Sequence, residues 1–119
     1  MPRRPPHAID ADARTAAVAT ARRFLDALLD YQRGHTTPRE RAILRANATG
    51  TLAYGLLAQP PRLPATPVAR GRIASLELDD SATMGAASLS ATIDRAGHLT
   101  PLALALRRHG DRWLVYRVG

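Results

Sequence analysis

The chain has 119 residues, a length that favours a single domain. Its hydrophobic content of 45% is sufficient for a buried core, and the absence of cysteine excludes disulfides and cysteine-ligated metal sites. The formal net charge is +7, and all 17 basic residues are arginine. Together with the abundant Ala and Pro, this arginine bias is typical of a GC-rich genome.

The positive charge raises the hypothesis of an anionic partner, either nucleic acid or an anionic membrane surface. The arginines are scattered over the whole chain, whereas a nucleic-acid footprint usually follows one element. Aromatic residues make up only 4% of the chain, which gives no stacking platform for single-stranded nucleic acid. An ordinary solvated basic surface is therefore the favoured interpretation of the charge.

The sequence shows no apolar run of about 18 residues that could span a membrane, and no signal peptide. It therefore predicts a soluble protein. We expect a cytoplasmic location, or an extracytoplasmic one if a leader or an anchor has been removed.

The first half of the chain has helical periodicity. Residues 1–9 are rich in Pro and Arg, and we expect them to be disordered or loosely docked outside a single domain that spans 10–119. Asp10 and Asp12 are candidate N-caps for a helix over about 12–32 that ends at Gly34. One apolar stripe follows this helix at helical spacing and comprises Ala17, Ala21, Phe24, Leu25, Leu28 and Tyr31.

Two shorter helices are predicted next. The segment Thr37-Pro38-Arg39-Glu40 is typical of a capping box with proline at the first helical position, and it predicts a helix to about Asn47. A third helix is expected over about 51–58, with Thr49 as a candidate cap. Prolines between residues 59 and 67 then predict a stiff, extended connector.

The last third of the chain predicts four strands by its alternation of apolar and polar residues. Because successive side chains of a strand point to opposite faces, parity assigns each residue to a face. The apolar face is predicted to contain Leu76, Leu78, Leu89, Ala91, Ile93, Leu102, Leu104, Leu106, Leu114, Tyr116 and Val118. The other face is predicted to contain Ser75, Glu77, Ser88, Ser90, Thr92, Ala103, Ala105, Arg107, Trp113, Val115 and Arg117.

The order of these elements predicts an α+β domain, with two to three N-terminal helices packed on the concave face of a four-stranded antiparallel sheet. This order and the closing strand Asp111-Arg112-Trp113-Leu114-Val115-Tyr116-Arg117-Val118 resemble the nuclear transport factor two-like (cystatin-like cone) superfamily. Within that superfamily, the small Arg- and Ala-rich chain is similar to accessory domains of bacterial conjugation and type IV secretion machinery. That resemblance implies docking to other proteins. Other members are ligand-binding proteins or enzymes such as dehydratases and isomerases.

An enzyme of this fold needs an acid or base inside the cone, where burial tunes its pKa. The predicted concave positions are almost all aliphatic, and we find no catalytic residue among them. Tyr31, Tyr54 and Tyr116 are the candidate polar contacts of a ligand pocket. The alternative is that they are core residues whose hydroxyls reach the rim or a backbone carbonyl.

The four histidines, His7, His35, His98 and His109, are far apart in the sequence, and no pair has metal-ligand spacing. We therefore predict surface histidines, no metal site and no cofactor.

The convex face is the predicted interaction surface. It combines small side chains with the only Trp, and the candidate residues are Trp113, Val115, Arg117, Arg107 and Glu77. The alternative is a solvated face with cross-strand charge pairs such as Glu77 with Arg107. The sequence thus favours a non-catalytic domain that binds a protein partner or a second copy of itself. A small-molecule binder or an enzyme that uses the cone interior is the alternative.

Overall fold

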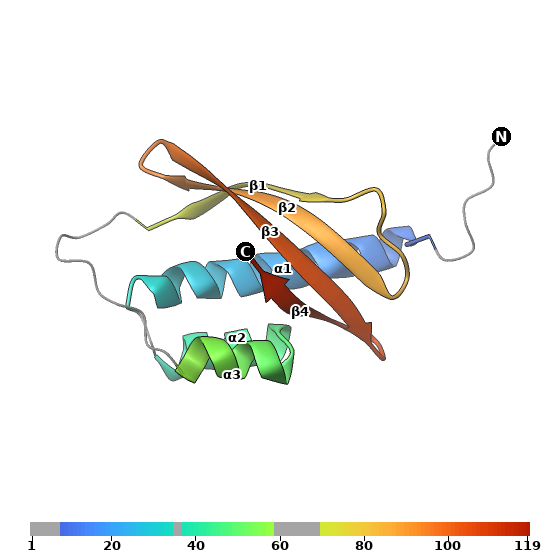
Figure 1. The fold of residues 1–119 in the computed structure, drawn as a ribbon, viewed down its shortest axis with the longest axis horizontal. Coiled ribbons are helices and arrows are strands. Elements are labelled where there is room, and N and C mark those ends of the chain that lie inside the picture. Colours follow the sequence, from blue (N-terminus) through green and yellow to red (C-terminus); the bar gives the residue numbers. More distant parts are fainter. Residues whose placement is uncertain (1–7, 35–36, 59–69) are drawn as a thin grey trace.

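The computed structural model describes residues 8–34, 37–58 and 70–119. The predicted N-terminal tail up to residue 7, the proline-rich connector, His7 and His35 lie outside these residues. Three helices precede a four-stranded sheet (Figure 1), which confirms the α+β class and the order of the elements.

Helix α1 (Ala11–Gln32) begins and ends as its sequence predicts. The carboxylate of Asp10 accepts a 2.8 Å hydrogen bond from the amide of Ala13. At the other end Gly34 has φ 90°, and its amide donates to the carbonyl of Tyr31. The whole predicted apolar stripe of this helix is buried.

Helices α2 (Pro38–Asn47) and α3 (Gly50–Ala58) also match the predicted bounds. Thr49 Oγ1 accepts a 3.3 Å hydrogen bond from the amide of Leu52, as expected of a cap. Thr37, in contrast, makes no side-chain capping hydrogen bond, so its half of the predicted capping box does not form. Pro38 still occupies the first helical position.

The strands β1 (Arg72–Leu78), β2 (Ala86–Arg95), β3 (His98–His109) and β4 (Arg112–Val118) form an antiparallel sheet in the order β1-β2-β3-β4. Ala96 (φ 53°) and Gly97 (φ 86°) form the tight turn between β2 and β3. His98 and His109 are exposed at the two ends of β3, in agreement with their predicted surface positions.

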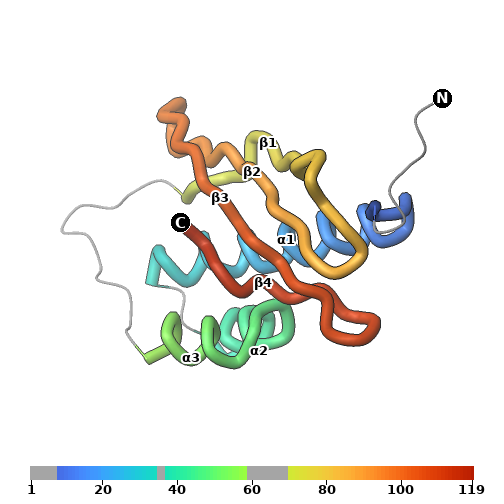
Figure 2. Tube along the Cα trace, turned by 45° about the vertical axis from the view of Figure 1, so that its right-hand side comes forward, coloured from blue at the N-terminus to red at the C-terminus, as the bar shows by residue number. Residues whose placement is uncertain are grey.

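Helix α1 contacts all four strands, whereas α2 and α3 contact β4. Figures 1 and 2 show α1 crossing one face of the sheet, with α2 and α3 beside β4. The core lies between α1 and this face and includes Phe24, Leu25, Leu89, Leu104 and Leu106. Ile9, expected in the N-terminal tail, is 2% exposed and belongs to this core. Its amide bonds to the carbonyl of Ala82, which fixes it beside the loop that joins β1 to β2.

The parity prediction is correct for β1, β2 and β3 but wrong for most of β4. Trp113 and Val115, expected on the convex face, are 4% and 0% exposed and lie in the core. The register changes between the pairs Ala105–Arg117 and Leu106–Val115, so Tyr116 has no opposite residue on β3. This extra residue is a β-bulge, and it reverses the side-chain alternation of the strand.

The bulge also changes the neighbours of Tyr116. Arg107 stacks on the ring of Tyr116, with its guanidinium carbon 4.1 Å from the ring centroid, on the face opposite α1. The predicted pair of Glu77 and Arg107 does not occur, because Glu77 lies opposite Ser90 and Arg107 lies opposite Ala86. The outer face therefore keeps Glu77, Arg107 and Arg117 but not Trp113.

A groove between helices α1 and α2 as the candidate functional site

A groove of about 850 Å³ lies between α1 and α2. Its α1 side consists of Arg23, Asp26, Ala27 and Asp30, which follow the spacing of one helical face. Its α2 side consists of Arg39, Glu40, Ala42, Ile43, Ala46 and Asn47, and Arg112 of β4 closes one end. Such a volume is in the range of ligand-binding clefts.

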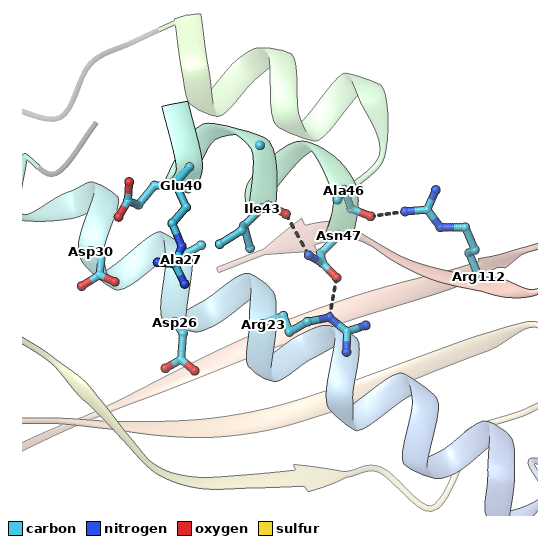
Figure 3. Close-up of a pocket in the computed structure, with 11 residues that line it drawn as sticks. Arg23, Asp26, Ala27, Asp30, Glu40, Ile43, Ala46, Asn47 and Arg112 are labelled. Carbon is cyan, nitrogen blue, oxygen red and sulfur yellow. Dashed lines mark hydrogen bonds between the residues drawn. The ribbon is translucent and has the colours of Figure 1, made fainter. Parts of the chain in front are cut away.

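The two ends of the groove carry different charges. Figure 3 shows the side chains of Asp26, Asp30 and Glu40 at one end and those of Arg23, Asn47 and Arg112 toward the other. The acidic end lies where α2 begins, and the basic end lies where α2 terminates. We call these the acidic end and the basic end of the groove.

Glu40 is the least satisfied polar residue at the acidic end. Its Oε2 atom is buried and has no hydrogen-bond partner, the only such side-chain atom in the described part of the chain. Buried polar atoms normally have a partner, because an unsatisfied one costs about 1–3 kcal/mol, and more when it is charged. Glu40 Oε2 is therefore a buried carboxylate oxygen in the groove wall whose hydrogen-bonding capacity is not used by the described residues.

The two aspartates of the acidic end are paired within the chain. Arg70 Nε donates a 2.6 Å hydrogen bond to Asp30 Oδ1, and Arg70 Nη2 lies 3.7 Å from Asp26 Oδ1. The hydrogen bond with Asp30 raises the pKa of Arg70 above its ordinary value, and the charges of Asp30 and Asp26 act in the same direction. Asp30 is thus engaged by Arg70, which lies two residues before β1.

The basic end is held by neutral groups. Arg23 Nε donates to Asn47 Oδ1 at 3.1 Å, and Asn47 Nδ2 donates to the carbonyl of Ile43 at 2.8 Å. Arg112 Nη2 donates to the carbonyl of Ala46, near the C-terminus of α2. Asn47 is only 7% exposed, so these bonds also satisfy a buried amide.

The predicted tyrosine pocket does not form. Tyr31 is buried, and its hydroxyl donates to the carbonyl of Leu56 at 3.2 Å, as the alternative interpretation of a core tyrosine expected. Tyr54 is 79% exposed on α3, and Tyr116 lies on the outer face of the sheet. The three side chains lie in separate places because α3 turns Tyr54 outward and the bulge turns Tyr116 away from α1.

A smaller pocket of about 310 Å³ lies between the C-terminal half of α1, α3 and strands β2 and β3. Its walls include Leu28, Leu29, Leu102 and Val118. The polar rim contains Arg95, which donates a 3.2 Å hydrogen bond to Gln32 Oε1. None of the three tyrosines lines it.

Over residues 8–34, 37–58 and 70–119, no group of three or more His, Asp or Glu side chains has an arrangement that could hold a metal ion. None of the helices described in the structure is long and apolar enough to cross a membrane.

Comparison with protein-family models and with curated proteins finds no match. Among solved structures, the chain is similar to a de novo designed beta-sheet protein studied by solution NMR. The two share 14% sequence identity with a TM-score of 0.54, over 88% of this chain and 87% of the design. This similarity concerns the fold alone.

The groove was not predicted from the sequence, although the sequence contains a signal for it. The lining residues of α1 and of α2 recur at helical spacing, so two stripes with charged members were visible in consecutive helices. Their meeting depends on how α2 folds back along α1, which the spacing alone does not determine.

Proposed function

We propose that this domain is a non-catalytic protein-interaction module that binds a segment of a partner protein in the groove between α1 and α2. The observation that carries the proposal is the buried, unpartnered Oε2 of Glu40 in the wall of that groove. The proposal keeps the docking role that the resemblance to secretion and conjugation accessory domains implies. It assigns that role to the groove in place of the surface around Trp113.

The chemistry of the groove favours binding over catalysis. Its two arginines at the basic end are engaged by the amide of Asn47 and the carbonyl of Ala46, and its aspartates are engaged by Arg70. A partner segment with a basic side chain would supply the donor that Glu40 lacks. Arginine fits best, because its guanidinium forms two parallel hydrogen bonds with a carboxylate.

A displayed library of random peptides, selected on the purified domain, tests this proposal. We expect the selected peptides to share an Arg or Lys, and to bind a Glu40→Gln variant about tenfold more weakly because a charge-assisted hydrogen bond is lost. Glu77→Gln is the matched control, since Glu77 is exposed on the outer face of the sheet. Peptides that bind wild type and Glu40→Gln equally would contradict the groove as the binding site.

Sedimentation of the unliganded domain distinguishes two kinds of partner. A monomer at all concentrations supports a different protein as the partner. A dimer that dissociates in Glu40→Gln, but not in Glu77→Gln, identifies a second copy of this chain as the source of the segment.

The pocket beside β2 and β3 favours a second candidate function, the binding of a small molecule. Its apolar walls and the Arg95 guanidinium suit a small apolar compound with an acidic group. Native mass spectrometry checks this candidate: a retained adduct lost in Leu102→Trp, which fills the pocket, supports it. Bare protein after exposure to a panel of hydrophobic carboxylic acids contradicts it.

A further inference from the structure

The groove continues beyond Asn47 into a second cavity of about 250 Å³. Both cavities are lined by Arg23, Ala46, Asn47 and Arg112. Trp113 and Asp111 line only the second one. The basic end of the groove is therefore the junction of two hollows, and two guanidinium groups border it.

The guanidinium of Arg23 is oriented by buried neutral groups. Besides the bond from Nε to Asn47, its Nη2 donates to Thr20 Oγ1 at 3.3 Å. Thr20 is 4% exposed and Asn47 is 7% exposed, so both are fixed in the core side of the groove. These bonds hold the guanidinium in place but leave its positive charge without a counter-ion.

Arg112, at the end of the groove formed by β4, also has a positive charge without a counter-ion among the described residues. Its described partner is the carbonyl of Ala46, which is also neutral. The ion pairs seen among the described residues involve Arg70 and Arg72, and neither Arg23 nor Arg112 takes part in one. Asp111, the acidic residue of the second cavity, forms no described ion pair with either arginine.

We propose that Arg23 and Arg112 form a carboxylate-binding subsite, which receives an acidic side chain from the partner segment whose basic side chain reaches Glu40. The subsite rests on the proposed function of the groove and names the second chemical group that the partner must carry. Two guanidinium groups present many N–H donors, and planar carboxylates match them well.

The other charges of the groove favour a peptide over nucleic acid. Asp26, Asp30 and Glu40 border the same cavity as the two arginines. A phosphate backbone, with one negative charge per nucleotide, would meet these carboxylates on its way along the groove. A segment with one acidic and one basic side chain meets fewer like charges, because its acidic group faces only Asp111 and its basic group only Arg39 among the lining residues.

Trp113 provides the signal for a direct test, because it lines the subsite and is the only tryptophan of the chain. The probes are capped peptides with one Glu and one Arg separated by two to five alanines, and matched peptides in which Gln replaces the Glu. We expect a saturable change of tryptophan fluorescence, and binding about tenfold weaker for the Gln peptide than for the best Glu peptide.

The same pair of peptides is then measured on Arg112→Gln, whose side chain is exposed and whose loss leaves only the exposed carbonyl of Ala46. We expect this variant to bind the Glu and Gln peptides equally, because the carboxylate has lost its partner. Arg22→Gln is the control, since Arg22 is exposed on α1 and lines neither cavity; it should retain the tenfold preference.

Other outcomes overturn the subsite. If wild type binds both peptides equally while Glu40→Gln weakens both, the groove binds the segment through its acidic end alone, and the proposed function survives without the subsite. The absence of a fluorescence change with every peptide also contradicts the subsite. If a single-stranded oligonucleotide binds more tightly than the peptides, and its binding is lost in Arg112→Gln, the ligand of the two arginines is a phosphate and the carboxylate subsite is wrong.

Discussion

Arg70 Nε and Asp30 Oδ1 are joined by a 2.6 Å hydrogen bond between residues 40 positions apart in the chain. Arg70 lies two residues before β1, and Asp30 lies in the last turns of α1, so the pair fixes the first strand to the long helix. The same aspartate borders the acidic end of the groove. One ion pair therefore connects the packing of the sheet with the shape of the candidate site.

The first prediction concerns the energy of this pair. The side chains of Arg70 and Asp30 are 36% and 30% exposed, so water screens their attraction. We expect Asp30→Asn to lower the free energy of unfolding by at most about 1 kcal/mol, and by less in high salt. Urea unfolding measures this, with Asp80→Asn as a control at an exposed turn residue. A decrease of several kcal/mol in the free energy of unfolding would contradict the expectation that water screens this pair.

The second prediction concerns pH. The amide of Gly97 donates to Asp94 Oδ1 at 2.8 Å, and Arg72 donates to Oδ2 at 3.1 Å. These interactions, the Gly97 bond first, lower the pKa of Asp94 below its usual value of 3.8. A carboxylate with a lowered pKa stabilises the fold fully above the unfolded pKa, and this stabilisation disappears as the pH falls through the folded pKa.

Asp94→Asn tests this linkage, because asparagine keeps an acceptor for Gly97 but loses the charge. We expect wild type to be more stable than the variant at neutral pH, and the difference to vanish when the pH falls below the folded pKa of Asp94. Urea midpoints across this pH range give the difference, and NMR titration of the Asp94 carboxyl gives its pKa. A constant difference at all pH values would contradict an effect of charge.

The sequence predicted the helices well because their signals are local. Asp10 and Gly34 mark the two ends of α1, and the apolar stripe from Ala17 to Tyr31 determines which side is buried. The face of β4 could not be predicted in the same way. Its residues alternate without interruption, and the extra residue at Tyr116 becomes visible only when the strand is paired with β3.

The groove lies between these two cases. Asp30 on α1 and Glu40 on α2 each belong to a set of lining residues that recurs at helical spacing within its own helix. The two residues come close together because α2 folds back along α1. The sequence suggested a capping role for Glu40. Because that role is local, it gave no indication that Glu40 lines a groove formed with α1. Tertiary packing, which local patterns do not contain, determined the candidate site.

The third prediction follows from the buried position of Trp113. Removing its indole leaves a large void in the core, so Trp113→Ala should lower the free energy of unfolding by about 3–5 kcal/mol. Tyr54→Ala is the control: the Tyr54 side chain is 79% exposed, and we expect a change within about 0.5 kcal/mol. Urea unfolding followed by circular dichroism measures both. Equal stability of the two variants would place Trp113 on the surface.

The fourth prediction compares two glycines, each replaced by alanine. A methyl group at Gly71 would lie 2.9 Å from Ile93 Cγ2 and 3.1 Å from Leu29 Cδ2, both in packed core side chains. We therefore expect Gly71→Ala to cost about 1–3 kcal/mol. Gly55 lies inside α3 with no atom within 4 Å of the added methyl. Because alanine is the better helix former, Gly55→Ala should stabilise the protein by about 0.5–1 kcal/mol.

Thermal unfolding of the two glycine variants gives opposite shifts if the packing is as described. The two substitutions add the same methyl group, so their difference isolates its surroundings. If Gly71→Ala did not change the stability, there would be space for a methyl group at residue 71. That result would contradict the close contact with Ile93 and Leu29. If Gly55→Ala were destabilising, the exposed side of α3 would be covered, because open space leaves a methyl group nothing to displace.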